Sequence, residues 1–178
     1  MPDQKSLELL ASNVQLLLMD CDGVLTDGRI WLFEPDDDQK GFNVRDGLGL
    51  DLWHSAGLKS GVISGRNSRA LELRASALGM SYIRQGCVHK MQTFREVLEE
   101  ARVSTEQVAY IGDDLNDIPL MRQAKLAFCV GDAVEEAKQV ANYVTKAHGG
   151  YGAVREVIEL ILKCQGRWAD VVQKFLAE

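Results

Sequence analysis

The sequence predicts an α/β fold in which a doubly wound parallel sheet is covered by helices on both faces. Two observations indicate this class. Short apolar runs such as Leu16–Met19 and Val108–Ile111 are typical of strands that are buried on both faces. They alternate with segments whose apolar residues recur at helical spacing, as in His89–Arg102. No repeat, low-complexity tract or linker divides the chain, so we expect one domain over residues 1–178.

Residues 29–45 are expected to form a β-hairpin flap, because the β-prone segments Arg29–Glu34 and Gly41–Arg45 flank the polar turn Pro35–Asp38. Residues 163–178 are expected to form a C-terminal helix and tail. The remaining expected elements, in chain order, are helix Ser6–Ala11, strand Leu16–Met19, helix Gly47–Ala56, strand Leu58–Ser64, helix Ser68–Leu78, strand Ser81–Ile83, helix His89–Arg102, strand Val108–Ile111, helix Asn116–Ala124, strand Lys125–Val130, helix Val134–Ala141, strand Tyr143–Val144, helix Ala153–Leu162 and helix Arg167–Leu176.

The composition excludes several classes of partner. A formal net charge of −6 argues against nucleic acid or an acidic membrane surface as a partner. No apolar run approaches the length of a membrane span, and the N-terminal segment lacks the apolar core of a secretory signal. The 4 cysteines are far apart and form no CxxC pair, which argues against zinc or disulfides and suits reduced thiols. We therefore expect a cytoplasmic protein whose main partner is neither nucleic acid nor a membrane.

Two acids, Asp20 and Asp22, directly follow the first buried strand. In open α/β sheets ligands bind outside the carboxyl ends of the strands, where this pair is expected to lie. Like charges held so close together raise each other's pKa, and a hard divalent cation such as Mg²⁺ relieves that repulsion. An Asp-rich turn that merely ends the strand is the alternative.

Three further polar signals stand at strand ends or helix starts: Ser64, Lys90 and the pair Asp113 and Asp114. Taken singly, Ser64 fits a turn or helix cap and Lys90 fits a solvated helix residue. The topology of a doubly wound sheet can bring all of them to the edge that holds Asp20. Their order along the chain therefore favours a catalytic site over separate local features.

With these motifs, DCDGV, Ser64, Lys90 and GDDLND, the sequence resembles the haloacid dehalogenase-like phosphohydrolases. The resemblance implies that Asp20 is the nucleophile that forms an aspartyl phosphate. It implies that Asp22 is the general acid and base. It also implies that Ser64 and Lys90 donate to the phosphoryl oxygens.

The same resemblance implies a Mg²⁺ ion held by the Asp20 carboxylate, the Asp22 main-chain carbonyl and the Asp113 carboxylate, with Asp114 in a supporting role. The segment between Asp22 and Ser64 has room for only a hairpin and a helix, so we expect no cap domain. A capless site is open to water unless the substrate or a neighbouring subunit covers it.

The segments TDG, FNVRDG, ISGR and GGYGAVREV are similar to one capless subfamily of these phosphohydrolases, which acts on phosphates of eight- and nine-carbon sugar acids. Its members are homotetramers whose hairpins meet at the subunit interface, which implies the same for this chain. Arginines suit the carboxylate of such substrates. The residues that the resemblance places near the substrate are Thr26, Asp27, Gly28, Arg45, Gly65, Arg66 and Arg74.

We therefore expect Mg²⁺-dependent hydrolysis of 3-deoxy-D-manno-octulosonate 8-phosphate, a step towards lipopolysaccharide. One alternative is the 9-phosphate of a nine-carbon sugar acid, as in sialic-acid-like pathways. The other is a non-catalytic binding or regulatory protein, against which the intact Asp20, Asp22, Lys90 and Asp113 argue. Tyr151 departs from the basic residue of many relatives in the GG-x-G loop and leaves the C-terminal closure open.

Overall fold

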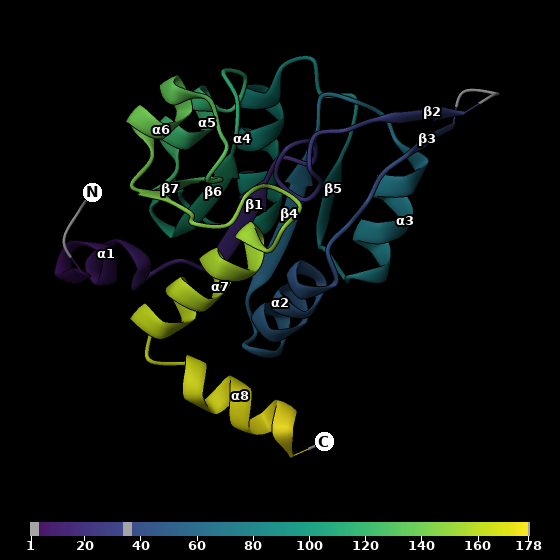
Figure 1. The fold of residues 1–178 in the computed structure, drawn as a ribbon. Coiled ribbons are helices and arrows are strands. Elements are labelled where there is room, and N and C mark those ends of the chain that lie inside the picture. Colours follow the sequence, from purple (N-terminus) through teal and green to yellow (C-terminus); the bar gives the residue numbers. More distant parts are fainter. Residues whose placement is uncertain (1–3, 34–36, 178) are drawn as a thin grey trace.

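The computed structural model describes residues 4–33 and 37–177. A six-stranded sheet with the order β5-β4-β1-β6-β7-β8 lies at its centre, and every neighbouring pair is parallel (Figure 1). The strands are β1 (Leu16–Met19), β4 (Lys59–Ile63), β5 (Tyr82–Arg84), β6 (Val108–Gly112), β7 (Leu126–Cys129) and β8 (Tyr143–Val144). The predicted doubly wound parallel sheet is confirmed.

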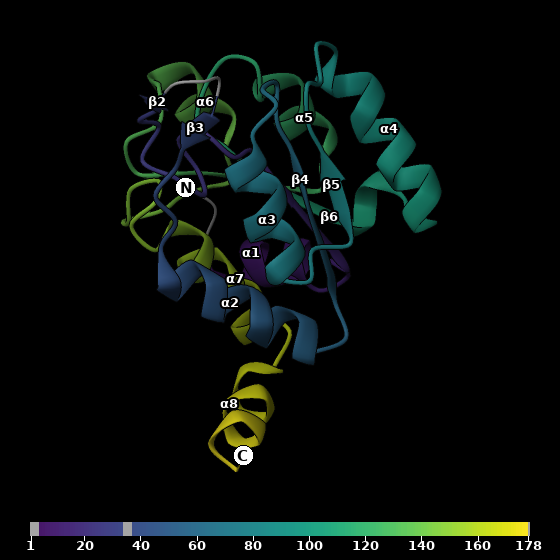
Figure 2. The same ribbon diagram turned by 90° about the vertical axis from the view of Figure 1, so that its right-hand side faces the viewer.

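Helices cover both faces of this sheet (Figure 1). One face carries α2 (Val44–Ser55), α3 (Arg69–Ala77) and α7 (Ala153–Cys164), and the other carries α4 (Lys90–Ala101), α5 (Ile118–Gln123) and α6 (Glu135–Val140). The smaller elements are α1 (Gln4–Ala11), which packs on α7, the 3₁₀ turn η1 (Thr105–Gln107) and α8 (Trp168–Leu176). Figure 2 shows α8 extending away from the body of the molecule.

The strand β1 fixes where the site lies. All four of its residues are buried, and it pairs with β4 on one side and β6 on the other. Met19 is in register with Val62 and Ile111, so these three strands end nearly level. The chain runs outward from β1 to β5 and then returns to β6 on the other side of β1. Such a reversal of direction creates the crevice in which open α/β sheets bind ligands.

The flap is a two-stranded antiparallel hairpin of β2 (Trp31–Phe33) and β3 (Asp37–Gln39), which projects from the sheet (Figure 1). A hairpin was predicted here, but its second strand, expected at Gly41–Arg45, was wrongly placed. The helix α2 begins at Val44 and not at the expected Gly47, because the Asn43 side chain accepts a hydrogen bond from the Arg45 N–H and caps it. Residues 34–36 of the expected turn Pro35–Asp38 and of strand Arg29–Glu34 lie outside the described residues.

The described residues between β1 and α2 contain only this hairpin, so no cap domain is inserted there. In the described parts of the chain, none of the helices combines the length and the apolar character that crossing a membrane requires. At the C-terminus, two cationic groups of α7 lie over the ring of Trp168 in α8: Cζ of Arg155 is 5.4 Å and Nζ of Lys163 is 5.2 Å from the ring centroid. These cation–π contacts attach α8 to α7.

Candidate active site

Three carboxylates meet at the carboxyl edge of the sheet. Asp20 follows β1, Asp113 follows β6, and Asp117 stands just before α5. One oxygen of each lies within 4.8 Å of the others. Asp20 and Asp117 are buried, and Asp113 is largely buried. The parallel register of β1 and β6 therefore brings together acids that are more than ninety residues apart in the sequence.

The loop after β1 packs directly onto this cluster at Gly23. A Cβ atom at this position would lie 2.6 Å from Cγ of Asp113, and Gly23 has a φ of +90°. Both the missing side chain and the left-handed backbone therefore require glycine here. The backbone of the DCDG motif thus packs against the Asp113 carboxylate of the GDDLND motif.

Lys90 joins the acids from the first residue of α4. Its Nζ lies 3.0 Å from Oδ2 of Asp20 and 2.9 Å from Oδ1 of Asp117, and the side chain is buried. Burial disfavours the charged amine, but the two carboxylates outweigh it and raise the pKa of Lys90 above its ordinary value. Lys90 is therefore held as a cation beside Asp20, the nucleophile that the resemblance implies.

Asp117 holds the cluster together. Its Oδ1 accepts hydrogen bonds from Lys90 and from the Tyr110 hydroxyl at 2.9 Å, and its Oδ2 accepts from the Asp113 N–H at 3.0 Å. Sequence reasoning left the role of this residue open. The available signal was its spacing, since GDDLND places it four residues after Asp113, near the start of a helix.

Lys90 does not fully balance the negative charges of Asp20 and Asp113. Burial, together with the charges of Asp117 and Asp20, raises the pKa of Asp113 to about 8. Burial and the charge of Asp117 raise the pKa of Asp20 to about 6, although Lys90 opposes this. Among the described residues, Oδ1 of Asp113 is buried with no hydrogen-bond partner.

These features fit a divalent metal ion. An unpartnered buried oxygen and paired anions are what a hard cation with oxygen ligands satisfies. Asp113, whose Oδ1 has no hydrogen-bond partner among the described residues, is the carboxylate best placed for the ion. Both oxygens of Asp117 contact protein donors, as do those of Asp20, from the Cys21 N–H and Lys90, and Asp20 is included as a ligand on the strength of the resemblance. The site thus supports a metal, and Asp117 orients the groups around it.

Asp22 lies on the outer side of the cluster with its side chain about one-fifth exposed, at 20%. Its Oδ1 accepts a hydrogen bond from Lys40, which directly follows β3 and whose side chain is fully buried. Its Oδ2 lies 3.9 Å from Nε of Arg66, a half-exposed residue. Two cations therefore face the proposed general acid, and only Arg66 was singled out from the sequence.

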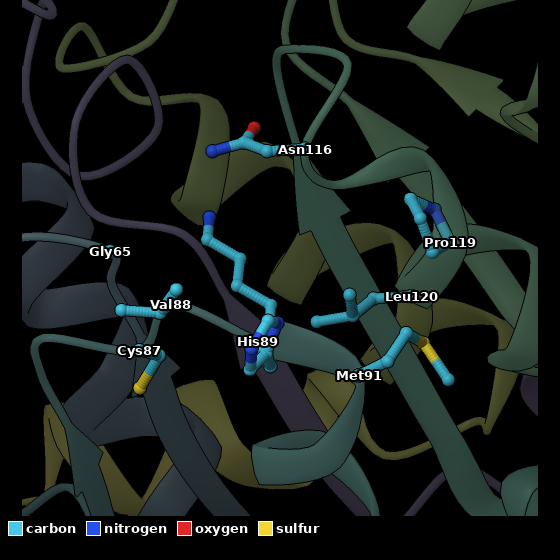
Figure 3. Close-up of a pocket in the computed structure, with 9 residues that line it drawn as sticks. Gly65, Cys87, Val88, His89, Met91, Asn116, Pro119 and Leu120 are labelled. Carbon is cyan, nitrogen blue, oxygen red and sulfur yellow. The ribbon is translucent and has the colours of Figure 1, made fainter.

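Ser64 and Gly65 stand at the end of β4, as expected. Ser64 is buried, and its hydroxyl accepts a hydrogen bond from the Arg66 N–H at 3.3 Å. Gly65 lines an open pocket of about 510 Å³. Its other lining residues come from the segment after β5, the start of α4, the segment after β6 and the helix α5, and include Val88, His89, Lys90 and Asn116 (Figure 3).

The residues of the loop after Asp22 hydrogen-bond to one another. Thr26 is fully buried, and its hydroxyl accepts a hydrogen bond from the Gly28 N–H at 3.2 Å. Asp27 accepts one from the Arg29 N–H at 3.1 Å. The side chain of Thr26 therefore holds the loop in shape, and its expected place near the substrate stays a prediction.

Three other expected site residues are not brought into contact with the acids. Arg45 is exposed on the first turn of α2. Arg74 is partly buried beside Gly47, and its Nε has no hydrogen-bond partner among the described residues. Asp114 is exposed and accepts from the Leu115 N–H at 2.6 Å. Their expected roles towards the substrate or metal stay predictions.

The FNVRDG segment is linked by hydrogen bonds to the GGYG segment, which in turn bonds to the loop after β1. The Asn43 amide donates to the Gly150 carbonyl at 3.1 Å, and the Gly150 N–H donates to the Val24 carbonyl at 3.0 Å. Buried Asp46 accepts from the Arg155 N–H at 2.8 Å and so caps the N-terminus of α7. Motifs that were singled out for likeness to a subfamily thus have a structural function.

Fold and site together define a hydrolase. The chain belongs to the haloacid dehalogenase-like hydrolases, whose family model matches residues 54–158, a range that includes Ser64, Lys90 and Asp113. It is 41% identical over 157 residues to the 3-deoxy-D-manno-octulosonate 8-phosphate phosphatase KdsC of Escherichia coli K12, covering 88% of this chain and 84% of the relative. The enzyme of the same name from Yersinia pestis is 43% identical over the same shares of both chains.

A solved structure extends the similarity to the whole fold. The 3-deoxy-D-manno-octulosonate 8-phosphate phosphatase of Moraxella catarrhalis, in complex with magnesium, phosphate and KDO, superimposes with a TM-score of 0.92. It is 36% identical, and the match covers 96% of this chain and 98% of that one. The chain is accordingly an enzyme of the phosphoric monoester hydrolase class.

Proposed function

We propose that this protein hydrolyses 3-deoxy-D-manno-octulosonate 8-phosphate to 3-deoxy-D-manno-octulosonate and phosphate, a step of lipopolysaccharide biosynthesis, with Mg²⁺ as its metal. The observation that carries the proposal is the buried cluster of Asp20, Lys90 and Asp113 in a chain that is 41% identical, over 88% of its length, to a phosphatase of that name. A catalytic cluster of this kind has no use in a non-catalytic binding protein, so we place that alternative last.

Asp20 is the proposed nucleophile. One of its oxygens attacks phosphorus, the bond from phosphorus to the sugar oxygen breaks, and the proton of Asp22 passes to that oxygen. Water then attacks the phosphorus of the aspartyl phosphate, and Asp22 takes its proton. The phosphorus–Asp20 bond breaks, which releases phosphate and restores both carboxyl groups.

The surrounding groups prepare Asp20 for this attack. Asp20 and Asp113, with the expected Asp22 main-chain carbonyl, would hold Mg²⁺, which would offset repulsion between the nucleophile and the phosphate. Lys90, whose Nζ lies 3.0 Å from Oδ2 of Asp20, supplies a buried positive charge beside the nucleophile. The hydroxyl of Ser64 is the proposed donor to a phosphoryl oxygen.

The cations beside Asp22 favour an acidic substrate. Arg66 is half exposed and stands 3.9 Å from Asp22, where the leaving group would lie. An arginine at this place suits the carboxylate of a sugar acid. An eight-carbon and a nine-carbon acid share this carboxylate, so the nine-carbon 9-phosphate stays the alternative substrate.

We infer further that the protein works as a homotetramer with its hairpins at the interface. Two aromatic and aliphatic side chains of β2, Trp31 and Leu32, are 57% and 79% exposed, and an isolated two-stranded hairpin is only marginally stable. Light scattering on the full chain tests this inference, and a monomer at micromolar concentration would contradict it. A cytoplasmic location, suggested by the four free cysteines, stays a prediction.

The substrate is tested by measuring phosphate release with Mg²⁺ from the eight-carbon 8-phosphate, the nine-carbon 9-phosphate and 4-nitrophenyl phosphate. We expect the highest kcat/KM for the eight-carbon acid. A preference for the nine-carbon acid would keep the mechanism and change the pathway. No turnover of any substrate would overturn the enzymatic proposal.

A further inference from the structure

We propose that Lys40 is a positioning residue that the flap delivers to the general acid Asp22; the inference rests on the proposed catalytic role of Asp22. Lys40 follows the last residue of β3 and donates a hydrogen bond to Oδ1 of Asp22, eighteen residues earlier in the chain. Neither residue lies in the same element as the other. The contact therefore joins the base of the flap to the loop after β1.

This pair differs from an ordinary surface ion pair. The Lys40 side chain is 0% exposed, whereas Trp31 and Leu32 on the other strand of the flap are largely exposed. A buried ammonium is costly unless an anion and hydrogen bonds compensate it. A fully buried lysine on the proposed acid, in a flap whose Trp31 and Leu32 are exposed, indicates a specific function for this lysine.

The two oxygens of Asp22 have different partners. Lys40 holds Oδ1, and Oδ2 has only the more distant Arg66 Nε, at 3.9 Å. A protonated carboxyl group keeps a carbonyl oxygen that accepts a hydrogen bond, so Lys40 can hold Oδ1 whether or not Asp22 carries its proton. Lys40 thereby fixes the side-chain rotamer and leaves Oδ2 as the oxygen that exchanges the proton with the leaving group.

The experiment separates proton transfer from binding and from folding. Lys40→Met removes the donor and keeps the length, Lys40→Arg keeps a donor, and Lys125→Met is the matched control, since it breaks a Lys125–Glu106 pair of 2.5 Å before β7. The kcat/KM values are measured for the eight-carbon sugar acid phosphate, for a pentose 5-phosphate without a carboxylate, and for 4-nitrophenyl phosphate, whose leaving group needs no proton.

A displaced general acid affects poor leaving groups only. We expect Lys40→Met to lower kcat/KM for both sugar phosphates by about 10- to 100-fold and for the aryl phosphate by less than about twofold. Lys40→Arg should lose less than Lys40→Met on the sugar phosphates. Lys125→Met should match the wild type on all three substrates.

Each other pattern overturns the inference. Equal losses on all three substrates mean a structural role, and a loss confined to the sugar acid means that Lys40 binds the carboxylate of the substrate. Unchanged rates, or an arginine variant as poor as Lys40→Met, mean that the contact does not serve catalysis. A wrong substrate proposal is distinguishable, because the wild type would then fail on the sugar acid while the pentose and aryl comparison still reports on Lys40.

Discussion

Replacing Asp46 with alanine should destabilise the protein by about 2–4 kcal/mol, because this carboxylate joins two distant motifs. Its Oδ1 accepts from the Arg155 N–H at 2.8 Å and its Oδ2 from the Gly152 N–H at 3.2 Å. The side chain is buried, so water does not replace it readily after truncation.

The magnitude follows from those two contacts. Loss of an N-terminal helix cap costs about 1 kcal/mol, up to about 2. Each amide left buried without a partner costs about 1–3 kcal/mol, and one of the two is expected to find water at the edge of the cavity. Burial raises the pKa of Asp46, so desolvation of the carboxylate offsets part of its benefit, and the sum lies well below the simple total.

Urea denaturation of the wild type and of Asp46→Ala, at equal protein concentration and with the same oligomeric state, measures this loss. In a thermal melt of a chain of this size, the same loss should lower the melting temperature by about 5–12 °C. Asp51→Ala is the control, since Asp51 is an exposed acid on the same helix and should change stability by less than about 0.5 kcal/mol. A loss of stability for Asp46→Ala as small as that of the control would refute the stabilising role of the Asp46 hydrogen bonds to Gly152 and Arg155.

Three other predictions concern the metal cluster. In the metal-free protein the pKa of Asp113 is raised from 3.8 to about 8, so its contribution to stability is full below about pH 4, declines as the pH rises and is lost above about pH 8. The urea midpoint should therefore fall between about pH 5 and pH 8 and level off above that, and an Asp113→Asn variant with the same slope would contradict this. EDTA should stop phosphate release and excess Mg²⁺ should restore it, so undiminished turnover in the chelator would count against the metal. Gly23→Ala should weaken Mg²⁺ binding, measured by calorimetry, at least about tenfold, since its Cβ would meet the Asp113 carboxylate, and wild-type affinity would refute that contact.

The core of the site was predictable from the sequence because its signals are local. A short apolar run that ends in acids marks a buried parallel strand and its carboxyl end, as at Met19–Asp20 and Gly112–Asp113. The handedness and order of such sheets then bring those ends together. Lys90 was predictable only together with these acids, since a lysine that opens an amphipathic helix is by itself typical of a solvated residue.

The residues that were missed depend on partners distant in sequence. Asp117 looks like an ordinary acid at a helix start, yet it accepts hydrogen bonds from Lys90 and Tyr110. Lys40 follows a polar stretch of sequence, where a lysine is expected to be solvated. It is buried where it contacts Asp22, eighteen residues earlier in the chain. The partners of Asp46 lie 106 and 109 residues away. Local pattern carries no signal for such contacts.

The start of α2 was misplaced for a different physical reason. Gly47 and Gly49 have low helix propensity, and they conceal the helical pattern of the segment. Both are needed for packing, since a Cβ at Gly49 would lie 3.2 Å from the Arg155 Cα of α7 and one at Gly47 would meet Arg74. Tertiary packing therefore overrides helix propensity there, and the helix begins earlier, at the Asn43 cap.

The phosphorylated enzyme intermediate provides the most direct measurement. Wild type, Asp20→Asn and Asp22→Asn are mixed with the eight-carbon substrate carrying ³²P in its phosphate, with Mg²⁺, and are quenched in acid within one turnover. We predict protein-bound label on Asp20 in the wild type, slower appearance and slower loss of label in Asp22→Asn, and neither label nor phosphate release in Asp20→Asn. Phosphate release by Asp20→Asn at the wild-type rate, or label on a residue other than Asp20, would contradict the proposed mechanism.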